Sequence, residues 1–92
     1  LDGKRIYGTI DRLIVTGTTV LAVDFKSNRR VPETTGDVPL GLLRQMGAYL
    51  SGLRQIYPDH TIEVAILWTQ TQQLMRLPHN IVIDALKDPT IS

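Results

Sequence analysis

A short apolar run ends in Asp24-Phe25-Lys26, so two opposite charges stand two positions apart at the end of a predicted strand. Successive side chains of a strand point to opposite faces of the sheet. Asp24 and Lys26 are therefore expected on one face. Leu21, Val23 and Phe25 are expected on the other. Two charges on one face restrict the fold, because they must be solvated, paired with each other or used by a site.

A second β-rich run precedes this strand and carries one acid, Asp11. Gly17 and Thr18 between the two runs predict a two-residue hairpin turn with glycine first. That turn pairs residues whose numbers sum to 35, which places Asp11 directly opposite Asp24. Opposed carboxylates have Cβ atoms about 4.5 to 5.5 Å apart and repel each other unless a cation lies between them. The hairpin therefore predicts a divalent metal site, with the Lys26 ammonium beside it.

The same three charges have a structural alternative. Asp24 and Lys26 also fit an ion pair at the solvated end of a strand, where lysine protects a sheet edge against unwanted pairing. Asp11 also fits a single exposed acid. The combination favours the metal site, because three charged groups at matching register on one hairpin face form the kind of cluster that marks functional sites.

Length and charge narrow the classes of function. The 92 residues suffice for one small domain, placed at 1–92, and both ends look cut, so we expect a piece of a longer protein. A net charge of +1 is too balanced for binding nucleic acid by bulk charge. No cysteine is present, which excludes disulfides and thiolate metal sites and fits a cytoplasmic location. No apolar run approaches the roughly 18 residues of a membrane span, so no membrane partner is expected.

The sequence predicts an α/β fold. The expected elements are strands at 5–15 and 19–27, an exposed loop at 28–38, a helix from Pro39 to Tyr57, strands at 61–69 and 74–77, and a C-terminal tail at 79–92 with a helical turn or two at 80–87. The helix is strongly marked, because large apolar residues recur at spacings of three and four. Since it connects the second and third strands, these are expected to be parallel. The prediction is a mixed β-sheet of about four strands with a crossover helix.

Two further pairs of residues are candidates for contact with a ligand. Gln45 and Tyr49 are four residues apart and share a face of the predicted helix, on the flank of its apolar stripe. Arg29 and Arg30 follow Lys26 in the predicted loop and fit a phosphate clamp. Each pair also has a structural interpretation. Tyr49 fits an aromatic at the edge of the core with its hydroxyl in water, and the arginines fit solvated surface charges.

Three short motifs follow one another along the chain. They are Gly8-Thr9-Ile10-Asp11-Arg12, Val23-Asp24-Phe25-Lys26, and Gln45-Met46 with Tyr49. The chain thereby resembles the PD-(D/E)XK nuclease superfamily and, within it, the RecB-type C-terminal nuclease domain of AddA, the helicase-nuclease of double-strand break repair. The similarity covers roughly residues 5–78. It implies a restriction-endonuclease-like core.

The resemblance implies a metal-dependent active site. Asp11 and Asp24 would bind Mg²⁺, with Mn²⁺ as the alternative ion, and the backbone carbonyl of Phe25 would be a third ligand. Lys26 would be the catalytic lysine. The family carries a further metal-binding histidine and an acid on helices before the first strand, and this chain begins after them. Weak activity or none is therefore expected from the 92-residue chain alone.

The resemblance also implies a substrate and partners. Gln45 and Tyr49 would complete the catalytic set by positioning the scissile DNA strand. With DNA as the substrate, the phosphate clamp that the loop sequence suggests for Arg29 and Arg30 would add contacts to the DNA. The parent would be a helicase-nuclease that acts with an AddB-type subunit on double-stranded ends and single strands of DNA in homologous recombination. ATP would be used only in the helicase part. The alternative is a segment without catalysis that contacts the DNA backbone or braces the helicase.

Overall fold

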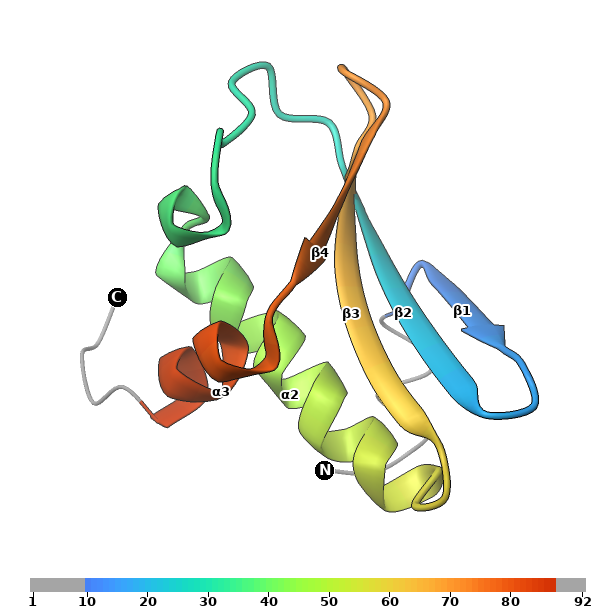
Figure 1. The fold of residues 1–92 in the computed structure, drawn as a ribbon. Coiled ribbons are helices and arrows are strands. Elements are labelled where there is room, and N and C mark those ends of the chain that lie inside the picture. Colours follow the sequence, from blue (N-terminus) through green and yellow to red (C-terminus); the bar gives the residue numbers. More distant parts are fainter. Residues whose placement is uncertain (1–9, 88–92) are drawn as a thin grey trace.

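The computed structural model describes residues 10–87, which form a mixed four-stranded sheet with helices against one of its faces (Figure 1). In chain order the elements are β1 (Arg12–Val15), β2 (Thr19–Lys26), a short 3₁₀ helix η1 (Thr35–Asp37), α2 (Leu40–Ile56), β3 (Thr61–Trp68), β4 (Gln73–Leu77) and α3 (His79–Lys87). The strands lie side by side in the order β1-β2-β3-β4. The predicted α/β class with a mixed four-stranded sheet is confirmed. Among residues 10–87, no helix has the length and apolar character needed to cross a bilayer.

The hairpin of β1 and β2 has the predicted register. Arg12 pairs with Val23, and every other pair of this antiparallel ladder has the same sum of 35. Thr16 N–H donates to Thr19 O at 2.8 Å and closes the turn. A type II′ turn requires a positive φ at its leading glycine, but the φ of Gly17 in this turn is not positive. The sequence therefore predicts the position of the turn but not the conformation of its glycine.

The strands β2 and β3 are parallel, as predicted, and Lys26 at the end of β2 lies beside Trp68 at the end of β3. The helix α2 makes the crossover between them. It begins after Pro39, whose carbonyl accepts the N–H of Leu43 at 3.0 Å, and it ends two residues before Pro58. Both prolines act as the sequence predicts, because proline is tolerated at a helix start and disfavours helix in the residue before it.

The core lies between the sheet and α2. Its largest fully buried side chains are Trp68, Met46, Leu50, Leu53, Ile66, Val20, Val64 and Val82. The even-numbered residues of β3, from Ile62 to Trp68, are all apolar, and this alternation predicts the buried face of the strand. Each of them is at most 2% exposed. Trp68 therefore belongs to the core.

The charged end of β2 lies on the face of the sheet that α2 covers. Asp24 follows Val20 and Ala22 on this face and is only 3% exposed. Phe25 on the opposite face is 41% exposed. The predicted alternation is confirmed, but a solvated strand end is wrong for Asp24. A buried carboxylate is costly unless other groups compensate its charge, so its neighbours define the site described below.

The predicted strands agree with the structure to within one residue, except for the first. That strand is predicted at 5–15, whereas β1 begins at Arg12 among the described residues. Residues 5–9 lie outside them. Asp11 directly precedes β1 in a bend, so it reaches the hairpin through its side chain rather than as a paired strand residue.

The segments predicted as loop and tail contain more structure than expected. The loop at 28–38 includes η1, and its last residue, Val38, is only 4% exposed. The predicted tail begins with the nine-residue helix α3, whose Val82 and Ala85 are buried, and residues 88–92 lie outside the described part of the chain. A helix of this length is marginal in isolation. Its packing against α2 therefore explains a helix that local sequence indicates only weakly.

Gly47 allows α2 and α3 to pack closely. A Cβ atom at this position would overlap the Val82 carbonyl and lie 3.3 Å from Leu86 Cβ. Gly47→Ala is therefore expected to lower the free energy of unfolding by about 2 kcal/mol, as overpacking does. Gly41→Ala, at a position of α2 with no such neighbour, should be neutral or stabilise the fold by about 0.5–1 kcal/mol. Urea denaturation measures both, and equal stabilities would contradict the close approach of the helices.

Candidate metal centre and active site

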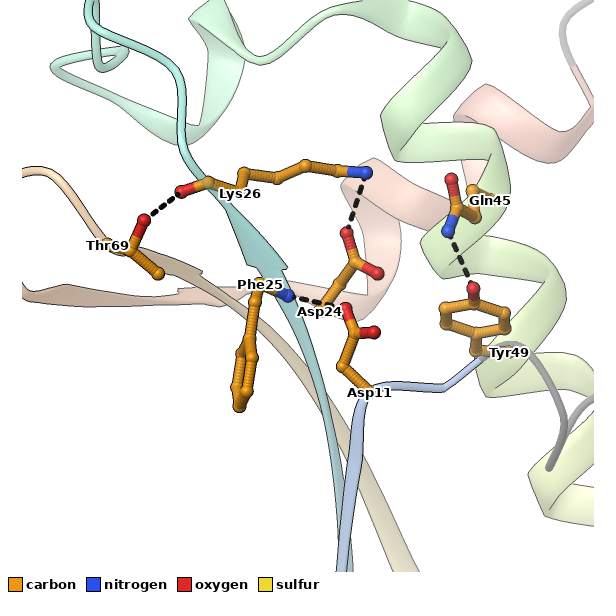
Figure 2. A network of polar contacts seen from close by, with 7 residues as sticks. All are labelled: Asp11, Asp24, Phe25, Lys26, Gln45, Tyr49 and Thr69. Carbon is orange, nitrogen blue, oxygen red and sulfur yellow. Dashed lines mark hydrogen bonds and ion pairs between the residues drawn. The ribbon is translucent and has the colours of Figure 1, made fainter.

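Asp24 and Lys26 form an ion pair on the helix-covered face of β2 (Figure 2). Lys26 Nζ lies 3.0 Å from Asp24 Oδ2, and the lysine side chain is 33% exposed. Asp24 Oδ2 is nevertheless buried and has no hydrogen-bond partner among the described residues. The Lys26 ammonium therefore offsets part of the charge of this oxygen. The oxygen retains capacity for a further ligand.

Asp11 reaches the same strand end from the chain before β1. Its Oδ2 accepts a hydrogen bond from the backbone N–H of Phe25 at 2.8 Å, which fixes the carboxylate beside the residue that follows Asp24 (Figure 2). Asp11 is exposed, whereas Asp24 is buried. The structure thus brings the two acids to one strand end, although Asp11 is not paired opposite Asp24 in the ladder. A metal ion shared by them stays a prediction.

The pKa of Asp24 is raised above the ordinary value of 3.8. Burial is the largest cause, because removing water from a carboxylate disfavours its ionised form. The Lys26 ammonium opposes the rise, and the nearby Asp11 carboxylate adds to it. Ionised Asp24 is therefore held in an unfavourable environment that one lysine only partly corrects. An additional cation at this position would stabilise it.

The two acids fit a hard divalent cation. Mg²⁺ prefers oxygen ligands at about 2.0–2.1 Å and keeps several waters, so a few protein oxygens suffice. Asp24 Oδ2 offers a buried oxygen without a hydrogen bond, and Asp11 adds a second carboxylate. No cluster of three or more His, Cys, Asp or Glu side chains suited to a metal occurs in residues 10–87. The carbonyl of Phe25 as a third ligand stays a prediction.

Gln45 and Tyr49 lie on the side of α2 that faces the charged strand end (Figure 2). Gln45 Nε2 donates a hydrogen bond to Tyr49 Oη at 2.6 Å. Tyr49 is 5% exposed, which is deeper than the predicted position at the edge of the core, whereas Gln45 is half-buried. The pair shares a helix face, as its spacing predicts, and lies on the same side of β2 as Asp24. A role in positioning DNA stays a prediction.

Arg29 and Arg30 follow β2 in the loop, and both are exposed. Arg29 borders a cavity that also includes Trp68. Arg30 borders a second cavity, on the part of the loop that leads to Pro39. The two arginines therefore lie at different cavities although they are adjacent in sequence. Their contact with DNA stays a prediction.

Thr69 fixes the end of β2 and was missed by the sequence reasoning. Its N–H donates to Lys26 O at 2.8 Å, and its Oγ1 donates to the same carbonyl at 3.2 Å (Figure 2). These bonds hold the lysine backbone where β2 leaves the sheet. The available signal is a threonine as the last residue of the predicted third strand, because the ends of parallel strands meet at one edge of a sheet.

Comparison of the chain with protein-family models, with curated proteins and with solved structures gives no match. The function is therefore inferred from the geometry at the end of β2 and from the sequence motifs that meet there.

Proposed function

We propose that this chain is the Mg²⁺-dependent deoxyribonuclease segment of an ATP-dependent helicase-nuclease. Its core would be restriction-endonuclease-like, of the PD-(D/E)XK superfamily, and its parent an AddA-type protein that acts on DNA ends in double-strand break repair. One observation carries the proposal. Asp24 Oδ2 is buried without a hydrogen bond among the described residues, 3.0 Å from Lys26 Nζ and close to the Asp11 carboxylate.

The three charged groups have complementary roles in phosphodiester hydrolysis. Asp24 and Asp11 would hold Mg²⁺, which when bound polarises a phosphoryl oxygen and lowers the pKa of a water ligand. The Lys26 ammonium offsets the negative charge that develops on the phosphate in the transition state, or orients the attacking water. A compact ammonium with three rotatable donors suits both tasks. No side chain has to form a covalent bond to the DNA.

Gln45 and Tyr49 provide neutral polar groups beside these charges. An amide and a phenol can hydrogen-bond to phosphate oxygens, which carry no sequence information. Their mutual bond of 2.6 Å orients both side chains before a substrate binds, which reduces the entropy lost on binding. Such a contact suits an enzyme that degrades DNA of any sequence.

Tyr49→Phe tests this role because it removes the hydroxyl and keeps the buried ring. In the complete parent enzyme we expect kcat/KM for linear DNA to fall about tenfold, while the free energy of unfolding changes by less than about 1 kcal/mol. Tyr57→Phe is the matched control, since Tyr57 lies at the opposite end of α2 from Gln45. Steady-state cleavage and urea unfolding measure both effects. Unchanged cleavage by Tyr49→Phe would assign Tyr49 to packing alone.

Degradation of linear DNA in the presence of Mg²⁺ tests the proposed function itself. The 92-residue chain should cleave poorly, because its net charge of +1 provides few phosphate contacts. A chain extended at its N-terminus into the parent should degrade DNA with Mg²⁺ or Mn²⁺, and Asp24→Asn should abolish this activity. DNA binding without any cleavage by the extended chain would instead favour a segment that contacts DNA or braces a helicase.

A further inference from the structure

An open cavity of about 820 Å³ lies beyond the ends of β2 and β3. The loop after β2 forms one side, and the turn between β3 and β4 forms the other. In Figure 1 this loop and this turn stand at the top of the view, away from α3. Ligand sites commonly have volumes of about 300–1,000 Å³, so the cavity is large enough for a nucleotide.

The walls of the cavity combine apolar and polar groups. Val31 and Pro32 from the loop and Leu74 and Met75 from β4 provide apolar surface. Met75 is half-buried, so part of this surface is accessible to a ligand. Apolar walls with a few polar groups are typical of sites for planar heterocycles.

The polar groups include both charges and neutral donors. Arg29 and Glu33 from the loop line the cavity, and so does Gln73 at the start of β4. A guanidinium suits a phosphate, which it can bind through two parallel N–H groups. Amide and carboxylate groups suit the donors and acceptors on the edge of a base.

Trp68 also lines this cavity, and its side chain is 0% exposed. Its Nε1–H is buried and has no acceptor among the described residues. A buried donor without an acceptor is destabilising. A ligand oxygen that displaced the side chains covering this N–H would relieve the deficit.

The cavity begins next to the charged strand end. Trp68 is the partner of Lys26 in the parallel ladder of β2 and β3. The next residue, Thr69, holds the Lys26 carbonyl at 2.8 Å. When a phosphate of a DNA strand lies at Lys26, the neighbouring nucleotide of that strand can therefore reach this cavity.

We propose that the cavity binds one unpaired deoxynucleotide of the DNA strand being cut, next to the scissile phosphate. This inference rests on the proposed function. The base lies against the apolar wall, its edge faces Trp68 and Gln73, and Arg29 contacts the phosphate. A base inside a duplex is stacked and paired, so only a single-stranded or extruded nucleotide enters such a cavity.

The single tryptophan gives a direct readout, because the chain has one indole N–H signal in a proton–nitrogen correlation spectrum. Thymidine 5′-monophosphate is titrated into the isotopically labelled 92-residue chain without any metal ion. We expect a saturable shift of the indole signal. Inorganic phosphate at the same concentrations should leave the signal in place. An indole signal that thymidine monophosphate does not move would overturn the inference.

Two variants that each remove one positive charge separate a specific contact from general charge attraction. Arg29→Ala should weaken binding of thymidine monophosphate about tenfold, because it removes a charge-assisted contact to phosphate. Lys87→Ala removes a charge from an exposed residue of α3 that does not line this cavity, and should change the dissociation constant less than about twofold. Equal weakening by both variants would overturn the inference, since general charge attraction would then explain the shift.

The absence of metal from this titration separates the inference from the proposed function. Binding of Mg²⁺ by the acids together with an unmoved indole signal would refute the nucleotide site alone. A shift that depends on Arg29, in a chain that binds no Mg²⁺, would support the nucleotide site and refute the metal site shared by Asp11 and Asp24.

Discussion

Under the proposed nuclease function, Lys26→Ala is expected to slow Mg²⁺-dependent cleavage of DNA about 100-fold or more while DNA binding changes little, because the ammonium would act on charge that develops only in the transition state. The structure places Lys26 Nζ 3.0 Å from the buried Asp24 and fixes its backbone through Thr69. Single-turnover rates and dissociation constants, measured on the N-terminally extended chain, separate the two effects.

Lys26→Arg is the conservative control. It keeps the positive charge, but a planar guanidinium cannot replace a compact ammonium, so the rate should recover only in part. Equal losses of rate and of DNA affinity in Lys26→Ala would contradict the catalytic role. They would make Lys26 an ordinary phosphate contact.

Removing Lys26 should also shift the pH dependence of metal binding. The ammonium lowers the pKa of Asp24, so Lys26→Ala should raise that pKa further. Protons compete with the metal ion for the carboxylate. The pH range in which Mg²⁺ affinity increases should therefore lie higher for the variant than for the original chain. The affinity of the variant should approach the original value only at high pH.

Asp24→Asn is expected to abolish Mg²⁺ binding and, without metal, to stabilise the fold by about 1 kcal/mol at neutral pH. The amide keeps the shape of the side chain and removes a charge whose burial raises the pKa of Asp24. For a domain of this size, the change corresponds to roughly 4–8 °C in Tm. With saturating Mg²⁺ the original chain should gain stability by mass action, and the variant should not.

The pH dependence of stability gives a second readout of Asp24→Asn. Folding raises the pKa of Asp24 from 3.8, so the folded state binds the proton more tightly than the unfolded state. The original chain therefore loses stability as the pH rises through the folded pKa, and the loss persists at neutral pH. Asparagine does not titrate, so the stability difference should grow above pH 3.8 and then level off.

Asp84→Asn is the control for these measurements, because it removes one exposed acid of α3. It should leave Mg²⁺ binding intact and change the free energy of unfolding by no more than about 0.5 kcal/mol. A metal-free Asp24→Asn protein that is less stable than the original chain would show that the ion pair with Lys26 outweighs the cost of burying Asp24.

The sequence predicts the parts of the fold that depend on local patterns. Gly17 and Thr18 occupy a short turn between two β-rich runs, and this alone determines the hairpin register. Pro39 and Pro58 bracket one apolar stripe at helical spacing, so the crossover helix and the parallel pairing of β2 and β3 follow from it.

Features that depend on packing between distant segments were not predictable. The burial of Asp24 depends on α2 lying over its face of the sheet, and alternation along β2 does not reveal which face is covered. The packing of α3 against α2 requires a glycine at position 47, because a Cβ atom there would overlap the Val82 carbonyl. The sequence does not show that these two residues meet. The cavity at Trp68 joins two loops that are distant in sequence.

The central claim, that Asp11 and Asp24 share a divalent ion, is tested most directly by adding Mn²⁺ to the isotopically labelled chain. The Phe25 N–H donates to Asp11 and directly follows Asp24. Paramagnetic Mn²⁺ bound by the two acids should therefore broaden the Phe25 amide signal at ion concentrations well below that of the protein. Asp11→Asn or Asp24→Asn should abolish this effect, and Asp84→Asn should not. A Phe25 signal that stays sharp while amides elsewhere broaden would contradict the account.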